Sequence, residues 1–246
     1  MCFSRIKLII EYLGTGYHGW QVQDNAQTVQ AEMEKAVHRI TGEEVRVTGA
    51  GRTDAGVHAL GQVAHFDTHS KIPAEKFQDA LNAVLPADVA VLSSGKAESG
   101  FHARFSSVSK TYEYRILNQR PRSPVMENRA WHIRDKLNIS KMCQAADCFL
   151  GEHDFSAFCS SGSSVSTYER SIYISKWIEE RDCLVYRVKG NGFLYNMVRI
   201  MTGTMVEIGL EKRFPDSILA LLDGKDRNQS GMTAPAHGLY LVTVHY

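Results

Sequence analysis

The residues best suited to chemistry lie in a glycine-rich stretch, GAGRTDAGVHA, which runs from residue 49 to residue 59. Its only formal charges are Arg52 and Asp54. Glycines at this density favour a loop in which the backbone bends sharply or lets another molecule come close. A carboxylate held on such a loop can act as a nucleophile or as a base. The alternative is that Asp54 only forms a turn, because Asp-Ala-Gly is also good turn chemistry.

The same stretch differs from the common phosphate-binding loops. Position 54 is Asp where the dinucleotide-binding pattern G-x-G-x-x-G has glycine, and the Gly-Lys-Ser/Thr ending of a P-loop is missing. Among the ten histidines, His65 and His69 are four residues apart, but they follow a strand pattern without an H-E-x-x-H signature. We therefore predict neither a nucleotide cofactor nor a metal site.

A second candidate is Arg199, the single charge between Phe193 and Val206. A buried arginine is rare unless it is paired, and a guanidinium binds a carboxylate well. The alternative is an arginine whose head group extends to solvent. Gly203, one helical turn further on, would let another backbone approach. We expect the helix to be buried because its apolar residues form one stripe: Leu194, Met197, Val198, Met201, Met205 and Ile208.

A third feature is the tyrosine pair Tyr112 and Tyr114, which share one face of a predicted strand with Ile116. The surrounding window contains one acidic residue, Glu113, and five basic ones, namely Arg104, Lys110, Arg115, Arg120 and Arg122. Aromatic residues interleaved with positive charge favour RNA binding. The alternatives are that both tyrosines are core residues, and that the charges only keep an edge strand soluble.

Six blocks of the sequence together resemble the TruA-type tRNA pseudouridine synthases. They occur in the order YHGWQVQ, TVQAEMEKA, GAGRTDAGVHALGQVAHFDT, FHARFSSVSKTYEYRI, GNGFLYNMVRIMTGTMVEIG and TAPAHGLYLV. The resemblance extends over nearly the whole chain, from Ile6 to Tyr246, and GRTDAGVHA is a highly specific motif. One departure is Leu13, where relatives commonly carry Asp, but this position lies outside the catalytic loop.

The resemblance implies isomerisation of uridine to pseudouridine in the anticodon stem-loop of tRNA, at tRNA positions 38 to 40. It also implies a homodimer that needs no metal or cofactor. The residues that match the family's functional positions are Asp54 as the catalytic aspartate, Arg199 as its partner, Tyr112 against the target base, Arg52 on the flipped nucleotide, and Leu239 or Leu241 in the pocket. The choice between the two leucines stays open.

Two other functions fit parts of the pattern. A non-catalytic tRNA-binding or tRNA-folding module would use Tyr112 and the basic window, and would tolerate the loss of Asp54. A hydrolase with Asp54 as a covalent nucleophile would need a second acid or base nearby. The loop offers only His58 for that role, and we expect His58 to be structural.

Strands and helices alternate along the chain, which predicts a mixed α/β fold whose largely antiparallel sheet is flanked by helices. The expected strands are 6–12, 62–67, 89–94, 110–118, the hairpin 171–190 and 238–246. The expected helices are 28–42, 73–84, 140–150, 194–209 and 215–222. We expect the hairpin to turn near residues 181–182 and the loop 159–167 to be mobile.

The order of the elements predicts two similar α/β halves joined through a continuous mixed sheet. The first half, residues 1–107, would carry the loop with Asp54. The second half, residues 108–246, would carry the strand with Tyr112 and the helix with Arg199. The reaction would therefore draw on residues from both halves.

Composition limits the remaining possibilities. The chain has 246 residues, and its 28 basic and 27 acidic residues give a net charge of +1, so global charge does not indicate an RNA partner. Five cysteines without a C-x-x-C pair suit reduced thiols in a cytosol. The N-terminal segment MCFSRIKLIIEYL is too short and too charged for a signal peptide, and no apolar run is long enough to span a membrane. We expect a soluble, cytoplasmic protein.

Overall fold

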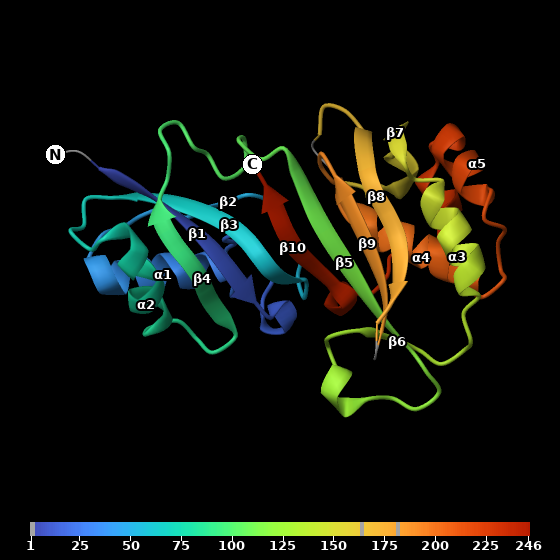
Figure 1. Cartoon of the computed structure of the whole chain (residues 1–246), viewed down its shortest axis with the longest axis horizontal. Helices are drawn as coiled ribbons and strands as arrows, with labels where there is room; N and C mark the ends of the chain where they lie inside the picture. Colours follow the sequence, from blue (N-terminus) through green and yellow to red (C-terminus); the bar gives the residue numbers. More distant parts are fainter. Residues whose placement is uncertain (1–2, 163–164, 181–182) are drawn as a thin grey trace. The chain divides into compact units, whose positions relative to one another are not determined.

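The computed structural model describes residues 3–162, 165–180 and 183–246. It contains two compact units, the chain up to Val108 together with Tyr240–Tyr246, and Ser109–Leu239. Strands and helices form both units (Figure 1), and most strand pairs are antiparallel, which confirms the predicted mixed α/β class. The division into halves at residues 107 and 108 stays a prediction. The predicted turn at 181–182 and the centre of the loop 159–167 lie outside the described residues.

The first unit is built on four strands that lie in the order β4 (Val89–Lys96), β1 (Ser4–Tyr12), β3 (His58–Thr68) and β10 (Leu239–His245), with β2 (Thr48–Gly49) beside β3. Strand β1 pairs antiparallel with both β3 and β4, whereas β10 pairs parallel with β3. Every second residue of β1 from Ile6 to Tyr12 is buried. This alternation is what the sequence predicts for a strand with one face on the core.

Two helices belong to this unit, α1 (Val29–Thr41) and α2 (Phe77–Asn82). Thr28 caps α1, because its side chain accepts a hydrogen bond from the amide of Ala31 at 3.4 Å. Gly42 ends α1 in the left-handed conformation with φ of 74°. These two capping residues are the first and the last residue of the expected helix 28–42. The apolar stripe of α1 is buried, and it comprises Val29, Met33, Ala36 and Val37.

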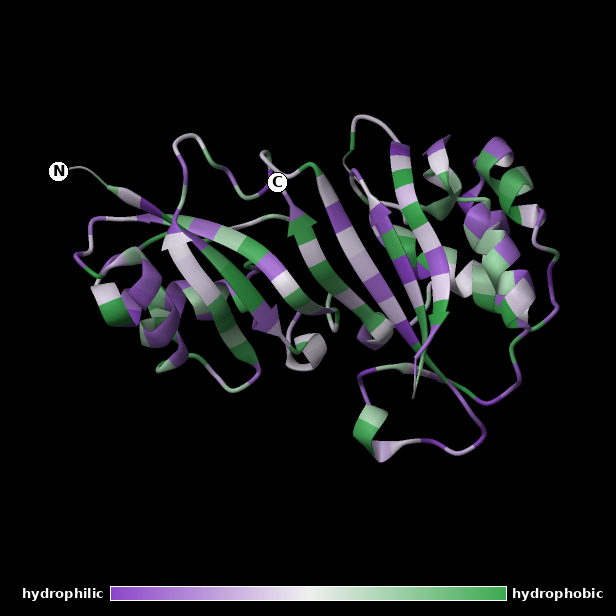
Figure 2. Ribbon diagram, in the orientation of Figure 1, coloured by the Kyte–Doolittle hydropathy of each residue, from purple (hydrophilic) through white to green (hydrophobic). Residues whose placement is uncertain are grey.

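The second unit has its strands in the order β5 (Ser109–Asn118), β9 (Leu184–Gly190), β8 (Glu169–Glu179) and β7 (Gly151–Asp154), with β6 (Trp131–Ile133) parallel to β5. The hairpin of β8 and β9 is antiparallel, as predicted. Hydrophobic and hydrophilic residues alternate along β8 (Figure 2), which fits a strand with one buried face. Strands β6 and β7 were not predicted from the sequence.

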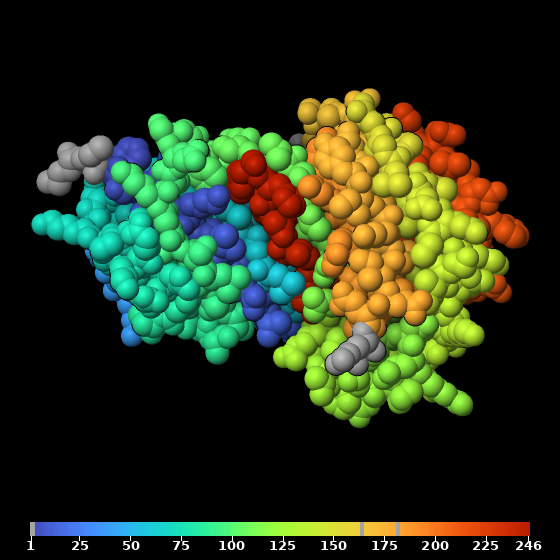
Figure 3. Space-filling view, in the orientation of Figure 1, coloured from blue at the N-terminus to red at the C-terminus, as the bar shows by residue number. Residues whose placement is uncertain are grey.

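The helices of the second unit are α3 (Ile139–Asp147), α4 (Met197–Gly209) and α5 (Ser217–Gly224). Helix α3 packs against β8 and α4. Strands β8 and β9 are open to view in Figure 3, and Figure 1 shows α4 behind them. Helix α4 is buried nearly all round, including Thr202 and Thr204, whose hydroxyls donate to the carbonyls of Val198 and Ile200. The predicted buried helix is therefore confirmed.

Short 3₁₀ turns complete the two units, at Gly14–Gly16, Ala74–Lys76, Pro124–Met126, Ser156–Phe158, Arg227–Gln229 and Ala236–Gly238. None of the helices in the described part of the chain combines the length and the apolar composition that a membrane span requires.

Candidate functional site

Asp54 lies half-buried on the loop between β2 and β3, between buried Thr53 and exposed Ala55. Its backbone carbonyl accepts a hydrogen bond from the amide of Val57 at 3.1 Å, which closes a tight turn. Gly56 completes this turn in the left-handed region, with φ of 78°. The turn that the sequence suggests therefore forms. It does not compete with a chemical role, because the turn uses the backbone of Asp54.

The segment 12–20 holds this loop in place by three hydrogen bonds. The amide of Trp20 donates to the carbonyl of Thr53 at 3.1 Å, and the amide of Gly56 donates to the carbonyl of Tyr17 at 3.2 Å. The hydroxyls of Tyr12 and Thr53 lie 2.8 Å apart. The backbone on both sides of Asp54 is thus fixed by a segment about 40 residues earlier in the sequence.

Two glycines allow that segment to lie so close to the loop. A Cβ on Gly14 would overlap the carbonyl of Val57, and a Cβ on Gly19 would overlap the carbonyl of Thr53. Gly19 also has φ of 88°, which favours glycine. The family-like block YHGWQVQ therefore contributes to the site by packing its backbone directly against the Asp54 loop.

His58 follows the loop and is fully buried. Its Nδ1 accepts a hydrogen bond from the amide of Gly14 at 2.9 Å, and its ring lies 4.7 Å from that of Tyr240. An acceptor at Nδ1 requires that this nitrogen carry no proton. The structural role expected for His58 agrees with these contacts, which connect the end of the loop to the 3₁₀ turn Gly14–Gly16 and to β10.

On β5, Tyr112 and Tyr114 share one face, as predicted, and both are buried. Tyr112 is 8% exposed, and its ring packs edge-on against Phe193 with 5.1 Å between centroids. The hydroxyl of Tyr114 donates to the carbonyl of Pro235 at 2.7 Å. Burial raises the pKa of Tyr114, and the positive charge of Arg199 opposes that rise. Tyr114 is therefore a core residue that lies within electrostatic range of Arg199.

Arg199 is half-buried at the first turn of α4. Its Nε donates to the carbonyl of Ala234 at 2.8 Å, and its Nη1 donates to Oδ1 of Asn196 at 2.7 Å. The amide of Ala234 in turn donates to the carbonyl of Arg199 at 3.1 Å. These bonds fix the plane of the guanidinium within the second unit. The pairing of Arg199 with Asp54 stays a prediction.

The acidic residue of the basic window around β5, Glu113, is buried and paired with arginine. Glu113 is 5% exposed and accepts two hydrogen bonds from Arg187, at 2.8 and 2.6 Å. Arg115 adds a contact of 3.6 Å to the same carboxylate. This group lies on the face of β5 opposite to Tyr112, because residues alternate along a strand. Because Glu113 pairs mainly with Arg187, which lies outside the window, this pairing does not reduce the excess of basic residues in the window.

The remaining residues predicted for the site are Arg52, Leu239 and Leu241. Arg52 is exposed on the Asp54 loop. Leu239 and Leu241 are 6% and 0% exposed, and Leu241 pairs with Ala59 of β3. Whether either leucine lines a uridine pocket stays a prediction.

Comparisons with known proteins agree on one family. A family model described as tRNA pseudouridine synthase matches residues 8–106 and 145–246. The tRNA pseudouridine synthase A of Ruminiclostridium cellulolyticum is 49% identical over 98% of this chain and 99% of its own. Its namesake in a Thermoanaerobacter species is likewise 49% identical, over the same shares of the two chains. The tRNA pseudouridine synthase A 2 of Clostridium tetani is 46% identical over 98% of each chain.

The chain belongs to the tRNA pseudouridine synthase family. The resemblance drawn from the six sequence blocks is therefore confirmed, and with it the class of enzyme, an isomerase. Residues Asp54 and Arg199 fall within the matched ranges, whereas Tyr112 falls between them.

One solved structure, described as an archaeal box H/ACA sRNP Nop10-Cbf5 complex, is similar over 97% of this chain and 48% of that one. The TM-score is 0.35 and the sequence identity is 13%.

Sequence reasoning missed the partners that orient Arg199 and the core residue Tyr114. Asn196 and the carbonyl of Ala234 fix Arg199, and Pro235 accepts from Tyr114. Asn196 has φ of 60°, a conformation that asparagine adopts more readily than most residues. The asparagine before a buried helix was thus a usable signal, whereas the two carbonyls gave none.

Among the residues that the structure describes, no three His, Cys, Asp or Glu side chains are grouped so that they could hold a metal ion.

Proposed function

We propose that this chain isomerises uridine to pseudouridine in the anticodon stem-loop of tRNA, at positions 38 to 40, with Asp54 as the reacting carboxylate. The observation that carries the proposal is the position of Asp54. It is the only acidic residue in the stretch 49–59, and hydrogen bonds fix the backbone on both sides of it. A carboxylate held in this way is positioned for reaction before the substrate arrives.

The chemistry needs few components. The bond from N1 of uracil to C1′ of the ribose breaks, the base turns, and C5 bonds to C1′. C5 loses its proton and N1 gains one, so atoms and electrons balance without an oxidant or a hydrolytic water. Asp54 can serve by attacking C1′, by attacking C6 or by removing a sugar proton. We therefore propose that no metal or cofactor takes part.

The target uridine must leave its stack, which costs a few kcal/mol. An aromatic face offsets part of that cost, since stacking of a base on an aromatic side chain is worth roughly 1–3 kcal/mol. We propose that Tyr112 provides this face, that exposed Arg52 helps hold the flipped nucleotide, and that Leu239 or Leu241 completes the pocket. Arg199 would keep Asp54 ionised, because a neighbouring positive charge favours the carboxylate.

We further propose that the protein acts in the cytoplasm as a homodimer on tRNA. Support for tRNA comes from the family and from the exposed Arg52, Arg104 and Arg120. The homodimer and the cytoplasmic location rest on the resemblance to the family and on the sequence composition.

The test is to incubate the protein with unmodified tRNA transcripts and to map pseudouridine by base-specific chemical labelling. We expect product at uridines 38 to 40, and none in a matched transcript that carries cytidine at those positions. A folded protein that binds tRNA but forms no pseudouridine in any transcript would instead be a non-catalytic RNA-binding module.

A further inference from the structure

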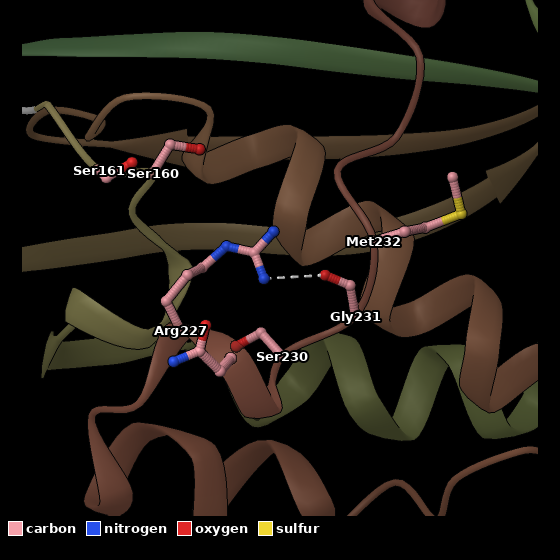
Figure 4. Close-up of a pocket in the computed structure, with 7 residues that line it drawn as sticks. Ser160, Ser161, Arg227, Ser230, Gly231 and Met232 are labelled. Atoms are coloured by element: carbon pink, nitrogen blue, oxygen red, sulfur yellow. Dashed lines mark hydrogen bonds between the residues drawn. The ribbon is translucent and has the colours of Figure 1, made fainter.

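A polar hollow in the second unit lies beside the turn that begins α4. It has a volume of about 450 Å³, within the range of roughly 300–1,000 Å³ that is usual for ligand sites. Its lining comprises the serine pair 160–161 and residues 227–228 and 230–232, and Figure 4 shows the guanidinium of Arg227 between these two groups. Arg227 is the one charged residue among the described residues that line it.

Two bonds within the second unit hold Arg227 in place. Its Nη1 donates to the carbonyl of Gly231 and its Nη2 to the hydroxyl of Thr233, both at 3.1 Å. A guanidinium has five N–H groups, so this arrangement orients the side chain and leaves donors for a ligand. Two nearby carboxylates already have partners. Asp226 accepts from the amide of Asn228 at 2.9 Å, and Glu207 accepts from Arg213 at 2.6 Å.

The hollow shares hydrogen bonds with the groups that orient Arg199. Asn196, which accepts from Arg199, donates through its Nδ2 to the hydroxyl of Ser160 at 2.9 Å. The amide of Ser160 donates to the carbonyl of Tyr195 at 3.1 Å. On the other side, the segment that Arg227 holds continues to Ala234, which accepts from Arg199. A ligand in the hollow would therefore lie next to the framework of Arg199.

We propose that this hollow binds a backbone phosphate of the tRNA substrate, with Arg227 and the hydroxyl of Ser161 as its donors. A fixed guanidinium beside serine hydroxyls suits a phosphodiester, because arginine can bind two phosphate oxygens at once. Such contacts position the nucleic acid without reading its sequence. Tyr195, whose carbonyl accepts from the amide of Ser160, is 48% exposed, and an exposed aromatic ring is a surface on which a base can stack. The inference rests on the proposed function, in which tRNA is the substrate.

The salt dependence of tRNA binding tests the proposal, because each phosphate contact contributes a slope of about 0.7–0.9 to the logarithmic plot. The affinity of an unmodified tRNA transcript is measured between 50 and 200 mM KCl for the unaltered protein and for Arg227→Gln. Across that range we expect the unaltered protein to lose about three-fold more affinity than the variant. Arg227→Lys, which keeps the charge, should retain the slope.

Ser161→Asp tests the same site without removing the bonds of Arg227. It places a carboxylate in the hollow and should weaken tRNA binding several-fold. Ser140→Asp is the matched control, an exposed serine of α3 in the same unit. The amide of Asn138 donates to the carbonyl of Gly209, so Ser140 lies near the far end of α4. The 13 residues of α4 separate the two serines by about 20 Å, which exceeds the Debye length.

Inorganic phosphate distinguishes a free anion from RNA as the ligand. Equal salt slopes for the unaltered protein and a correctly folded Arg227→Gln variant would overturn the proposal. If phosphate raises the melting temperature of the unaltered protein only, while the salt slopes stay equal, the hollow binds free phosphate and not RNA. Binding needs no turnover, so an Arg227-dependent slope without pseudouridine formation would refute the proposed function and leave this inference standing.

Discussion

Asp54 lies on a loop that backbone contacts fix, whereas Arg199 lies on a buried helix and is oriented by hydrogen bonds of its own side chain. The loop depends on the absence of side chains at Gly14 and Gly19. The helix depends on apolar burial and on close contact with the segment that ends at Ala234. A loop has no regular hydrogen bonds of its own, so a neighbouring segment must supply them.

The largest expected effects come from adding one methyl group in each region. Gly14→Ala would overlap the carbonyl of Val57, and Gly203→Ala would overlap the carbonyl of Met232. Neither backbone can move without disturbing its neighbours, so we expect each variant to lose about 3 kcal/mol of unfolding free energy or more. Chemical denaturation measures the loss. The matched controls are Gly95→Ala and Gly224→Ala, where a Cβ meets nothing within 4 Å. If Gly14→Ala were as stable as Gly95→Ala, the close packing of the Asp54 loop would be refuted.

A double-mutant cycle tests whether the two regions form one site. Arg199→Met and Asp54→Leu each remove one charge, and a pair in which one partner is lost leaves the other charge uncompensated. We expect the double variant to be more stable than the sum of the single effects predicts, with a coupling of about 1–3 kcal/mol. The cycle of Arg187→Met with Asp54→Leu should show no coupling, because Arg187 pairs with Glu113. A coupling near zero in both cycles would show that Arg199 and Asp54 do not form one charge pair.

A smaller loss of unfolding free energy is expected at acidic pH, and it should affect the first unit. Burial, aided by the charges of Arg5 and His102, lowers the pKa of His65 on β3 from 6.5 to about 4, although Asp67 opposes the shift. Between these two pH values His65 is protonated in the unfolded chain but neutral in the folded chain. The free energy of unfolding therefore falls as the pH drops through 6.5 towards 4. We expect a loss of about 2 kcal/mol between pH 7 and pH 5, which His65→Gln should reduce. Hydrogen exchange should show faster opening of β3 but not of β9.

The exposed His69 provides the control for this experiment. It lies four residues after His65, and His69→Gln should leave the pH dependence of stability unchanged. If His65→Gln and the unaltered protein lost the same stability between pH 7 and pH 5, another group would be responsible for the acid sensitivity.

The sequence predicts those parts of the fold in which the signal is local. The alternation along β1 was sufficient to predict that strand, and the capping residues of α1 were sufficient to predict where that helix begins and ends, because both signals depend on neighbouring residues. Strands β6 and β7 were missed because three and four residues are too few to show a period.

The candidate site shows the same limit. Its glycine-rich loop and its lone helical arginine were visible as residue types in the sequence. The acceptor for Arg199, the carbonyl of Ala234, was not, because every residue carries a backbone carbonyl. The burial of Glu113 beside Arg187 was also invisible, since the two residues meet only across paired strands.

The most direct test of the account is the rate of pseudouridine formation by Asp54→Asn at saturating tRNA, measured together with its tRNA affinity and melting temperature. Asparagine is nearly isosteric with aspartate but cannot act as a nucleophile or a base. We predict no product above the level without enzyme, tRNA affinity within a few fold of the unaltered protein, and an intact fold. Product formation at the rate of the unaltered protein would contradict the assignment of Asp54 as the reacting carboxylate.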